Sequence, residues 1–218
     1  MSKAQITEKR RLASPATTPQ ALAWDSRNKM LWMGSRDLRR IYAIDPEKGT
    51  VLRQQEAPGI PWAAVALNGE FRFTIGEGDD DDRYIYRYTT KDGFSKMFAC
   101  PELTGSYLSF DGRNLYMSQW YKERVLKFDD HGNVIGEIHV GAEICGHVFT
   151  NGSLYVLRGH ERPSEDWRIA RLNLQEETPV AEDIAVVPFA ARSLTFDGEL
   201  FWSNYRAKDA IISFSLPK

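Results

Sequence analysis

The chain has 218 residues, of which 42% are hydrophobic and 27% are charged, as in an ordinary globular protein large enough to bury a core. Its net charge of −2 provides no basic field, so we expect neither a nucleic-acid partner nor a membrane partner. No segment approaches the ~18 consecutive apolar residues of a membrane span.

The chain opens with MSKAQITEKRR, which has basic side chains but no apolar core and is therefore not predicted to be a secretory signal. Residues 4–13 are predicted to form a polar, exposed strand that precedes the rest of the fold. The two cysteines, Cys100 and Cys145, form no CxxC pair and no recognisable disulfide framework. These features together favour a reducing, cytoplasmic location.

Five segments with one shared pattern follow in chain order. Each contains an apolar strand, an Asp or Asn turn, a strand rich in aromatic residues, a polar loop and an alternating third strand. The turn residues are Asp25, Asn68, Asp111, Asn151 and Asp197. The last four precede glycine, and Asx-Gly between apolar runs is a strong hairpin signal because such turns need positive φ. The turns recur every 40–46 residues or so, about the spacing of β-propeller blades.

The sequence therefore predicts an all-β fold: a single five-bladed β-propeller with four-stranded antiparallel blades. The blades are expected near residues 19–57, 61–100, 104–140, 143–187 and 190–218. The last blade is too short for four strands, so we expect residues 4–13 to close it by pairing with the strand around residues 211–215. The alternative is a β-sandwich, which gives no reason for one column of residues to repeat five times.

The blade pattern, LxFDGxxLYxS followed by IxxFDxxGxVxxxI, resembles the broad NHL, YncE and SMP-30-like group of propellers over nearly the whole chain. Five-bladed members of the wider class include tachylectin-like lectins, arabinanase-like glycosidases and plant-type glutaminyl cyclases, and the chain carries no diagnostic active-site motif of any of them. The resemblance implies that ligands bind at one end of the central channel. That end is built by the loops that enter the innermost strands and by those between second and third strands.

The second of these loop types is roughly four or five residues longer in blades two and four than in the short blades. The insertion in blade two contains the run Asp79 to Asp82, which we interpret as a solvated acidic loop on the ligand-binding face. Consecutive aspartates cannot all converge on one Ca²⁺ ion, and a D-x-D-x-D-G pattern is absent. No cofactor is predicted. Ca²⁺ at the aspartate run, or a transition metal at His147 and His160 with Glu143 or Glu77, are the alternatives.

Strand ends on this face supply the polar and aromatic side chains typical of a small-molecule pocket. The predicted substrate-binding residues are Arg36, Trp62, Tyr107, Trp120, Tyr121, Arg158, Arg192, Asn204 and Tyr205. The predicted catalytic residues are Glu77, Glu143, His147 and His160, each of which offers one acid–base group. Arg158 is expected to hold an anionic group in its planar fork of donors. Alternatively, these side chains cap strand ends and line a water-filled channel.

Cys145 and His147 stand two residues apart, on the same side of a strand, but a nucleophilic pair also needs an orienting third group. A buried cysteine and a hydrogen-bonded histidine explain the pattern equally well. We therefore predict a monomeric propeller that binds a small molecule. It is either an enzyme of hydrolase, lyase or cyclase type acting by acid–base chemistry on a polar or anionic substrate, or a non-catalytic lectin-like or protein-interaction propeller. The site columns differ between blades, which favours one asymmetric pocket over five equivalent lectin sites.

Overall fold

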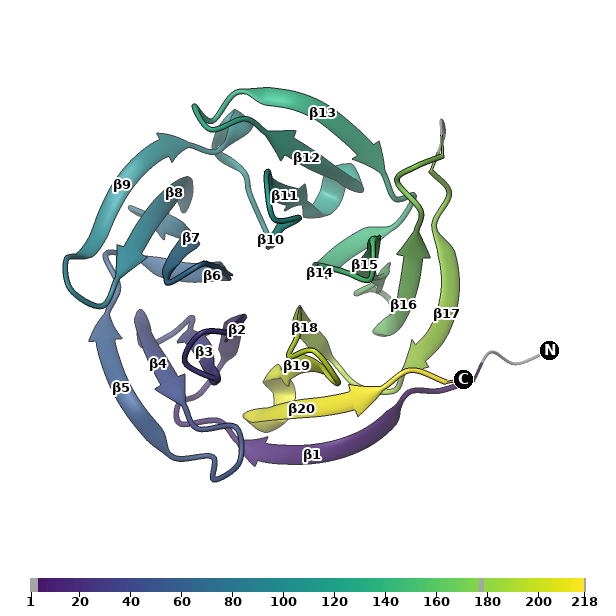
Figure 1. Cartoon of the computed structure of the whole chain (residues 1–218), viewed down its shortest axis with the longest axis horizontal. Coiled ribbons are helices and arrows are strands. Elements are labelled where there is room, and N and C mark those ends of the chain that lie inside the picture. The colour runs from purple at the N-terminus through teal and green to yellow at the C-terminus, as the bar shows by residue number, and fades with distance from the viewer. Residues whose placement is uncertain (1–3, 177–178, 218) are drawn as a thin grey trace.

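Five antiparallel sheets of four strands each radiate around a central axis (Figure 1) in the computed structural model, which describes residues 4–176 and 179–217. The predicted five-bladed propeller is thereby confirmed. The innermost strands are β2, β6, β10, β14 and β18, and their bounds are given with their blades below. None of the described helices is long and apolar enough to cross a membrane.

The blades follow one another along the chain. Blade one contains β2 (Pro19–Asp25), β3 (Met30–Ser35), β4 (Arg40–Ile44) and β5 (Val51–Glu56). Blade two contains β6 (Ile60–Leu67), β7 (Glu70–Glu77), β8 (Asp82–Thr89) and β9 (Gly93–Ala99). Blade three contains β10 (Leu108–Phe110), β11 (Leu115–Gln119), β12 (Arg124–Phe128) and β13 (Val134–His139). Blade four contains β14 (Glu143–Thr150), β15 (Ser153–His160), β16 (Asp166–Leu172) and β17 (Glu182–Val187). Blade five contains β18 (Ala191–Phe196), β19 (Phe201–Tyr205), β20 (Ala210–Ser215) and β1 (Thr7–Ala13). Single 3-10 turns occur at η1 (Pro101–Leu103), η2 (Trp120–Lys122) and η3 (Arg206–Lys208).

The repeated Asx residues form the turns between first and second strands in two ways. Asn68 and Asn151 lie at positive φ (46° and 50°), as do the glycines that follow them, which is the geometry of a type I′ hairpin turn. The aspartates instead accept backbone N–H groups. Oδ1 of Asp197, for example, accepts the N–H groups of Glu199 and Leu200, both at 2.7 Å. An aspartate satisfies the turn through its carboxylate, and no positive φ is then needed at that residue.

The core lies between neighbouring blades. Between blades one and two, the buried Trp32 ring lies 4.9 Å from Phe71 and 5.5 Å from Tyr88, measured between ring centroids. Trp167 and Trp202 are similarly buried in blades four and five. Such aromatic side chains bury a large area each, so blade-to-blade packing supplies most of the hydrophobic stabilisation of the ring.

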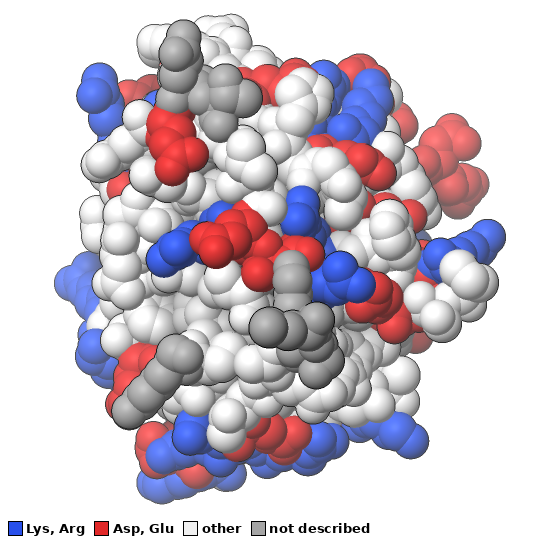
Figure 2. Space-filling model, turned by 90° about the vertical axis from the view of Figure 1, so that its right-hand side faces the viewer, with Lys and Arg blue, Asp and Glu red and all other residues white. Residues whose placement is uncertain are grey.

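The N-terminal strand closes the ring, as predicted. β1 pairs antiparallel with β20, with Thr7 opposite Ser215 and Ala13 opposite Ala210, and it forms the outer strand of blade five (Figure 1). The backbone N–H of Ile6 also donates to the carbonyl of Val186 in blade four at 3.1 Å. Figure 2 views the ring edge-on from the side of blade four, where acidic and basic side chains are interspersed.

Bulges in the innermost strands set the direction of the side chains at one end of the axis. The register shifts between Pro19 and Ala21 in β2 and between Pro61 and Ala63 in β6. The extra residues at these two bulges are Gln20 and Trp62. A bulge takes its extra side chain out of the regular alternation of the strand, and both side chains line the axial cavity described next.

Candidate functional site

A cavity of ≈ 750 Å³ lies on the axis, at the end built by the loops that enter the innermost strands and by those between second and third strands. This is the end that the sequence resemblance implied. All five blades contribute side chains to it, and each contribution is different. The cavity is large enough for a small molecule and combines aromatic walls with arginine and carboxylate groups.

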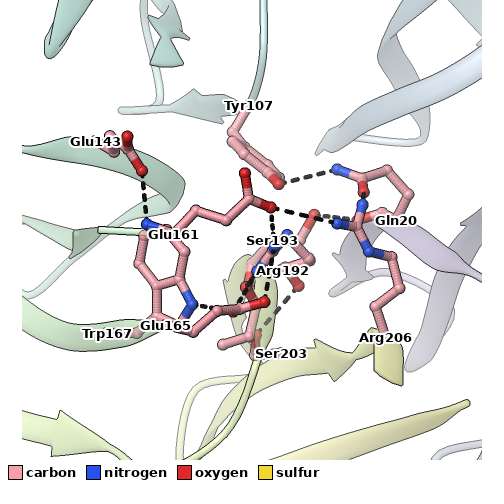
Figure 3. Close-up of polar contacts among 11 residues, drawn as sticks. Gln20, Tyr107, Glu143, Glu161, Glu165, Trp167, Arg192, Ser193, Ser203 and Arg206 are labelled. Atoms are coloured by element: carbon pink, nitrogen blue, oxygen red, sulfur yellow. Dashed lines mark hydrogen bonds and ion pairs between the residues drawn. The ribbon is translucent and has the colours of Figure 1, made fainter. Parts of the chain in front are cut away.

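In the deepest part of the cavity, side chains from three blades form a hydrogen-bonded network (Figure 3). Nε2 of Gln20 donates to the Tyr107 hydroxyl at 2.9 Å, and the Arg206 guanidinium donates to Oε1 of Gln20 at 2.8 Å. Because a guanidinium only donates, it fixes which end of the Gln20 amide faces Tyr107. Burial, and after it the neighbouring Cys145, raises the pKa of Tyr107. The hydroxyl therefore keeps its proton at neutral pH and can donate it to a ligand.

Arg192 joins this network to the wall of blade four. Its side chain is 2% exposed and forms ion pairs with Glu161 at 2.9 Å and with Glu165 at 3.0 Å. The guanidinium also lies over the rings of Trp120 and Trp167, at 5.4 and 5.3 Å from their centroids. Burial disfavours the Glu165 carboxylate, but hydrogen bonds from Arg192 and Trp167 outweigh this effect and lower the pKa of Glu165.

Glu161 is the carboxylate that faces the cavity from this cluster (Figure 3). Its Oε1 accepts a hydrogen bond from Arg192 and lies 3.9 Å from Arg206, while Oε2 has no hydrogen-bond partner among the described residues. Its backbone N–H donates to Oε2 of Glu143 at 2.8 Å, which fixes the start of the inserted loop. The Glu161 side chain is 35% exposed, so a ligand can reach it.

Blade two supplies the opposite wall through Trp62. The indole N–H of Trp62 donates to Oδ1 of Asp81 at 2.8 Å, and Oδ2 of the same carboxylate accepts from Arg83 at 3.0 Å. Arg83 lies over the Trp62 ring at 4.0 Å, and Arg36 lies over it at 5.1 Å. The run of aspartates is thus the tip of a lengthened hairpin in which Asp81 positions a wall of the cavity. Asp79 is exposed.

Six of the nine predicted substrate-binding residues line the cavity: Arg36, Trp62, Tyr107, Trp120, Tyr121 and Arg192. Two others lie just outside it. Asn204 is buried and donates through Nδ2 to the backbone carbonyls of Gln20 and Ala21, so it holds the strand that carries Gln20. Tyr205 packs against Phe189, with ring centroids 5.0 Å apart.

The structure places His147 in the core instead of the cavity. Its Nε2 lies 3.1 Å from the carbonyl oxygen of Tyr107, and its Nδ1 lies 2.6 Å from the Ser109 hydroxyl. A carbonyl can only accept, so Nε2 carries the proton and Nδ1 accepts from Ser109. Burial lowers the pKa of His147 to about 4. Both ring nitrogens are occupied, so the imidazole does not activate Cys145, and burial raises the pKa of that thiol.

Arg158 and His160 also lie apart from the axis. They line a separate cavity of ≈ 180 Å³ on the outer part of blade four. The Arg158 guanidinium donates to Asp183 at 2.7 Å and to the carbonyls of Ala181 and Val140 at 3.0 and 2.5 Å, so its donors are occupied within the protein. Glu77 accepts hydrogen bonds from Tyr86 and, at 2.6 Å, from Lys96 in the outer strand of blade two.

Among the side chains of the polar network in the site, sequence reasoning missed Gln20, Glu161, Glu165 and Arg206. Arg206 stands in the same column as Tyr121 and His160, two positions after the residues predicted to close the second strands. Gln20 occupies in blade one the place that Trp62 occupies in blade two. Extending the aligned columns would have found these two. Glu161 and Glu165 lie in an insertion with no counterpart in the short blades, so no column contains them.

The described residues contain no group of three or more His, Cys, Asp or Glu side chains that could hold one metal ion. In the aspartate run, both oxygens of Asp81 already accept hydrogen bonds, from Trp62 and Arg83.

The fold and the cavity define a five-bladed propeller with one asymmetric axial site. No family model matches the sequence, and no curated protein matches it. Among solved structures, the chain is similar to glutaminyl cyclase from Myxococcus xanthus, with a TM-score of 0.75, 10% identity, and coverage of 99% of this chain and 98% of the other.

Two further solved structures are also similar. One is XC5397, a gluconolactonase from Xanthomonas campestris, with a TM-score of 0.62, 14% identity, and coverage of 100% of this chain and 96% of the other. The other is the calcium-binding protein regucalcin from Agrobacterium tumefaciens, with a TM-score of 0.61, 11% identity, and coverage of 99% and 96%. At these identities the likeness establishes the fold alone.

Proposed function

We propose that the axial cavity binds a small polar molecule with a carbonyl group and that Glu161 acts on it as the acid–base group. The observation that carries this proposal is the state of the Glu161 carboxylate. Arg192 anchors one of its oxygens, while the other has no hydrogen-bond partner among the described residues and faces a cavity of ≈ 750 Å³. An acid–base group needs this combination of fixed position and one oxygen available to the substrate.

Tyr107 supplies the complementary group. Its hydroxyl accepts the Gln20 amide hydrogen and therefore has its own proton available for a substrate oxygen. A donor fixed in advance and aimed at an oxygen that gains negative charge stabilises the transition state of a reaction at a carbonyl. Glu161 removes or returns a proton on the same bound molecule. Trp62 and Trp120 provide apolar contact area on the cavity walls.

The similar structures support this reaction class by their names. A glutaminyl group contains a carboxamide and a gluconolactone contains an ester, so cyclase and lactonase both denote chemistry at a carbonyl carbon. The five blades contribute different side chains, which supports one small-molecule site over five repeated ones. A small-molecule ligand needs no large docking surface on the protein.

A turnover screen tests the proposal. The parent protein, Glu161→Gln and Tyr107→Phe are incubated with glutaminyl dipeptides, aldonolactones and small esters, and products are followed by mass spectrometry. Glu182→Gln, on the outer strand of the same blade, is the matched control. We expect the parent to convert at least one substrate and Glu161→Gln to lower kcat by about 10²-fold or more, with Glu182→Gln unchanged. Equal rates for Glu161→Gln and the parent would remove Glu161 from the reaction. Binding without conversion would make the protein a non-catalytic binder.

A further inference from the structure

Three arginines gather at the side of the cavity where blades five and one meet. Arg192 is matched by Glu161 and Glu165, and Arg206 is hydrogen-bonded to Gln20 at 2.8 Å. The Arg36 guanidinium has no carboxylate or carbonyl partner among the described residues, and it lies over the face of the Trp62 ring, 5.1 Å from the ring centroid. Arg36 lines the cavity, so its guanidinium donors are available to a ligand there.

The positive charges of this group outnumber the carboxylates that are paired with it. Three arginines face two glutamates, which leaves one formal positive charge. The effect is visible at Arg206, where burial lowers the pKa of the guanidinium and the charges of Arg192 and Arg36 lower it further. The positive surplus is local to these three arginines. Elsewhere in the lining Arg83 pairs with Asp81 and Lys122 pairs with Glu102, which leaves the carboxylates of Asp80 and Asp82.

Resting on the proposed function, we propose that Arg36, Trp62 and Arg206 form a subsite for a carboxylate carried by the ligand. The substrate class is then a small carboxylic acid whose second, reactive carbonyl group lies beside Glu161 and Tyr107. A guanidinium matches a carboxylate with two parallel hydrogen bonds, and Trp62 supplies an apolar surface beside it. One bound negative charge also removes the repulsion between Arg36 and Arg206.

The surroundings favour a single negative charge over a double one. The local surplus at the three arginines amounts to one unit, and the carboxylates of Asp80 and Asp82 line the same cavity. A phosphate would bring nearly two negative charges next to these carboxylates. We therefore assign the subsite to a carboxylate and treat phosphate as a competing outcome.

Matched ligand pairs test this assignment by isothermal titration calorimetry at pH 7.5. The pairs are L-glutamine with L-glutaminamide and L-pyroglutamate with L-pyroglutamamide, and inorganic phosphate is titrated separately. The protein variants are Arg36→Gln and, as matched control in the same loop, Arg39→Gln. We expect the parent and Arg39→Gln to bind the acid of a pair about tenfold tighter than the amide, and Arg36→Gln to lose this preference.

The outcomes separate this inference from the function on which it rests. Equal affinity of the parent for acid and amide, or an acid preference that survives Arg36→Gln, would overturn the carboxylate subsite and leave the proposed function standing. Tighter binding of phosphate than of either acid would also overturn it. A parent protein that binds none of the probes would overturn the carbonyl-binding function and the subsite together.

Discussion

The Gln20 amide in blade one donates a hydrogen bond of 2.9 Å to the Tyr107 hydroxyl in blade three, across the axis of the ring. These blades are not neighbours, since blade two lies between them (Figure 1). Arg206 from blade five holds the other end of the same amide. The contact therefore couples the geometry of the site to the arrangement of three blades.

Tyr107→Phe tests this coupling. The substitution removes the acceptor of the Gln20 amide inside a buried network, so we expect the free energy of unfolding to fall by about 1 kcal/mol. Urea denaturation measures the change. Tyr121→Phe is the control, because Tyr121 is 83% exposed and its loss of a hydroxyl should leave stability unchanged. Identical stability of the two variants would show that the Gln20 amide is satisfied equally well by water.

Deletion of residues 1–14 should strongly destabilise the ring. It removes β1 and leaves the edge of β20 unpaired. We expect the melting temperature to fall by about 10 °C or more, since each kcal/mol is worth about 2–4 °C in a chain of this size. Glu8→Gln, which breaks the exposed ion pair with Arg11 but keeps the strand, should change stability by less than about 0.5 kcal/mol. A deletion variant that melts with the parent would refute closure by β1.

The aspartates of the blade-two hairpin should differ in their effects. Asp81→Ala leaves the Trp62 indole and Arg83 without their shared acceptor, so we expect a loss of about 1–2 kcal/mol and a shift in tryptophan fluorescence. Asp79→Ala, at an exposed position, should stay within about 0.5 kcal/mol of the parent. Both effects are measured by urea denaturation followed by fluorescence. Equal and negligible effects of the two substitutions would show that the whole run of aspartates is a solvated loop.

His147 should make stability fall in mild acid. Its pKa is lowered from 6.5 to about 4 by burial, so the unfolded chain binds a proton at a higher pH than the folded protein does. The contribution of neutral His147 is therefore complete above pH 6.5 and is lost as the pH falls toward 4. It amounts to about 3 kcal/mol at 1.36 kcal/mol per pKa unit.

Urea denaturation at pH 7 and pH 4.5 measures this effect in the parent and in His147→Gln. Carboxylates also titrate in this range, so the difference between the two proteins isolates the histidine. We expect the stability of the variant to depend less on pH. The same pH dependence in both proteins would show that folding does not lower the pKa of His147.

The architecture was predictable because it depends on a repeated local signal. Asx turns at regular spacing determine where hairpins form, and each blade uses the same solution. Even the closure by β1 could be predicted, because a fifth blade without an outer strand leaves an unpaired edge that another segment must cover.

The sequence predicted which face of the molecule carries the site, but it did not predict the contacts between the side chains there. Sequence columns gave Arg36, Trp62 and Arg192, which do line the cavity. They did not show that Asp183, in another strand, occupies the guanidinium of Arg158. Nor did they show that β14 turns His147 toward Ser109. Such pairings depend on register, bulges and three-dimensional proximity, and these emerge only when the strands are assembled.

The pairing of β1 with β20 also constrains the order in which the strands can fold during synthesis. Synthesis proceeds from the N-terminus, so β1 leaves the ribosome first but has no strand to pair with until β20 has emerged. We expect the first four blades to form while β1 remains unpaired, and ring closure to be the last and slowest step, because it joins the two ends of the chain. Pulsed proteolysis during translation would then find β1 to be the last strand to gain protection, whereas early protection would place closure before completion of the ring.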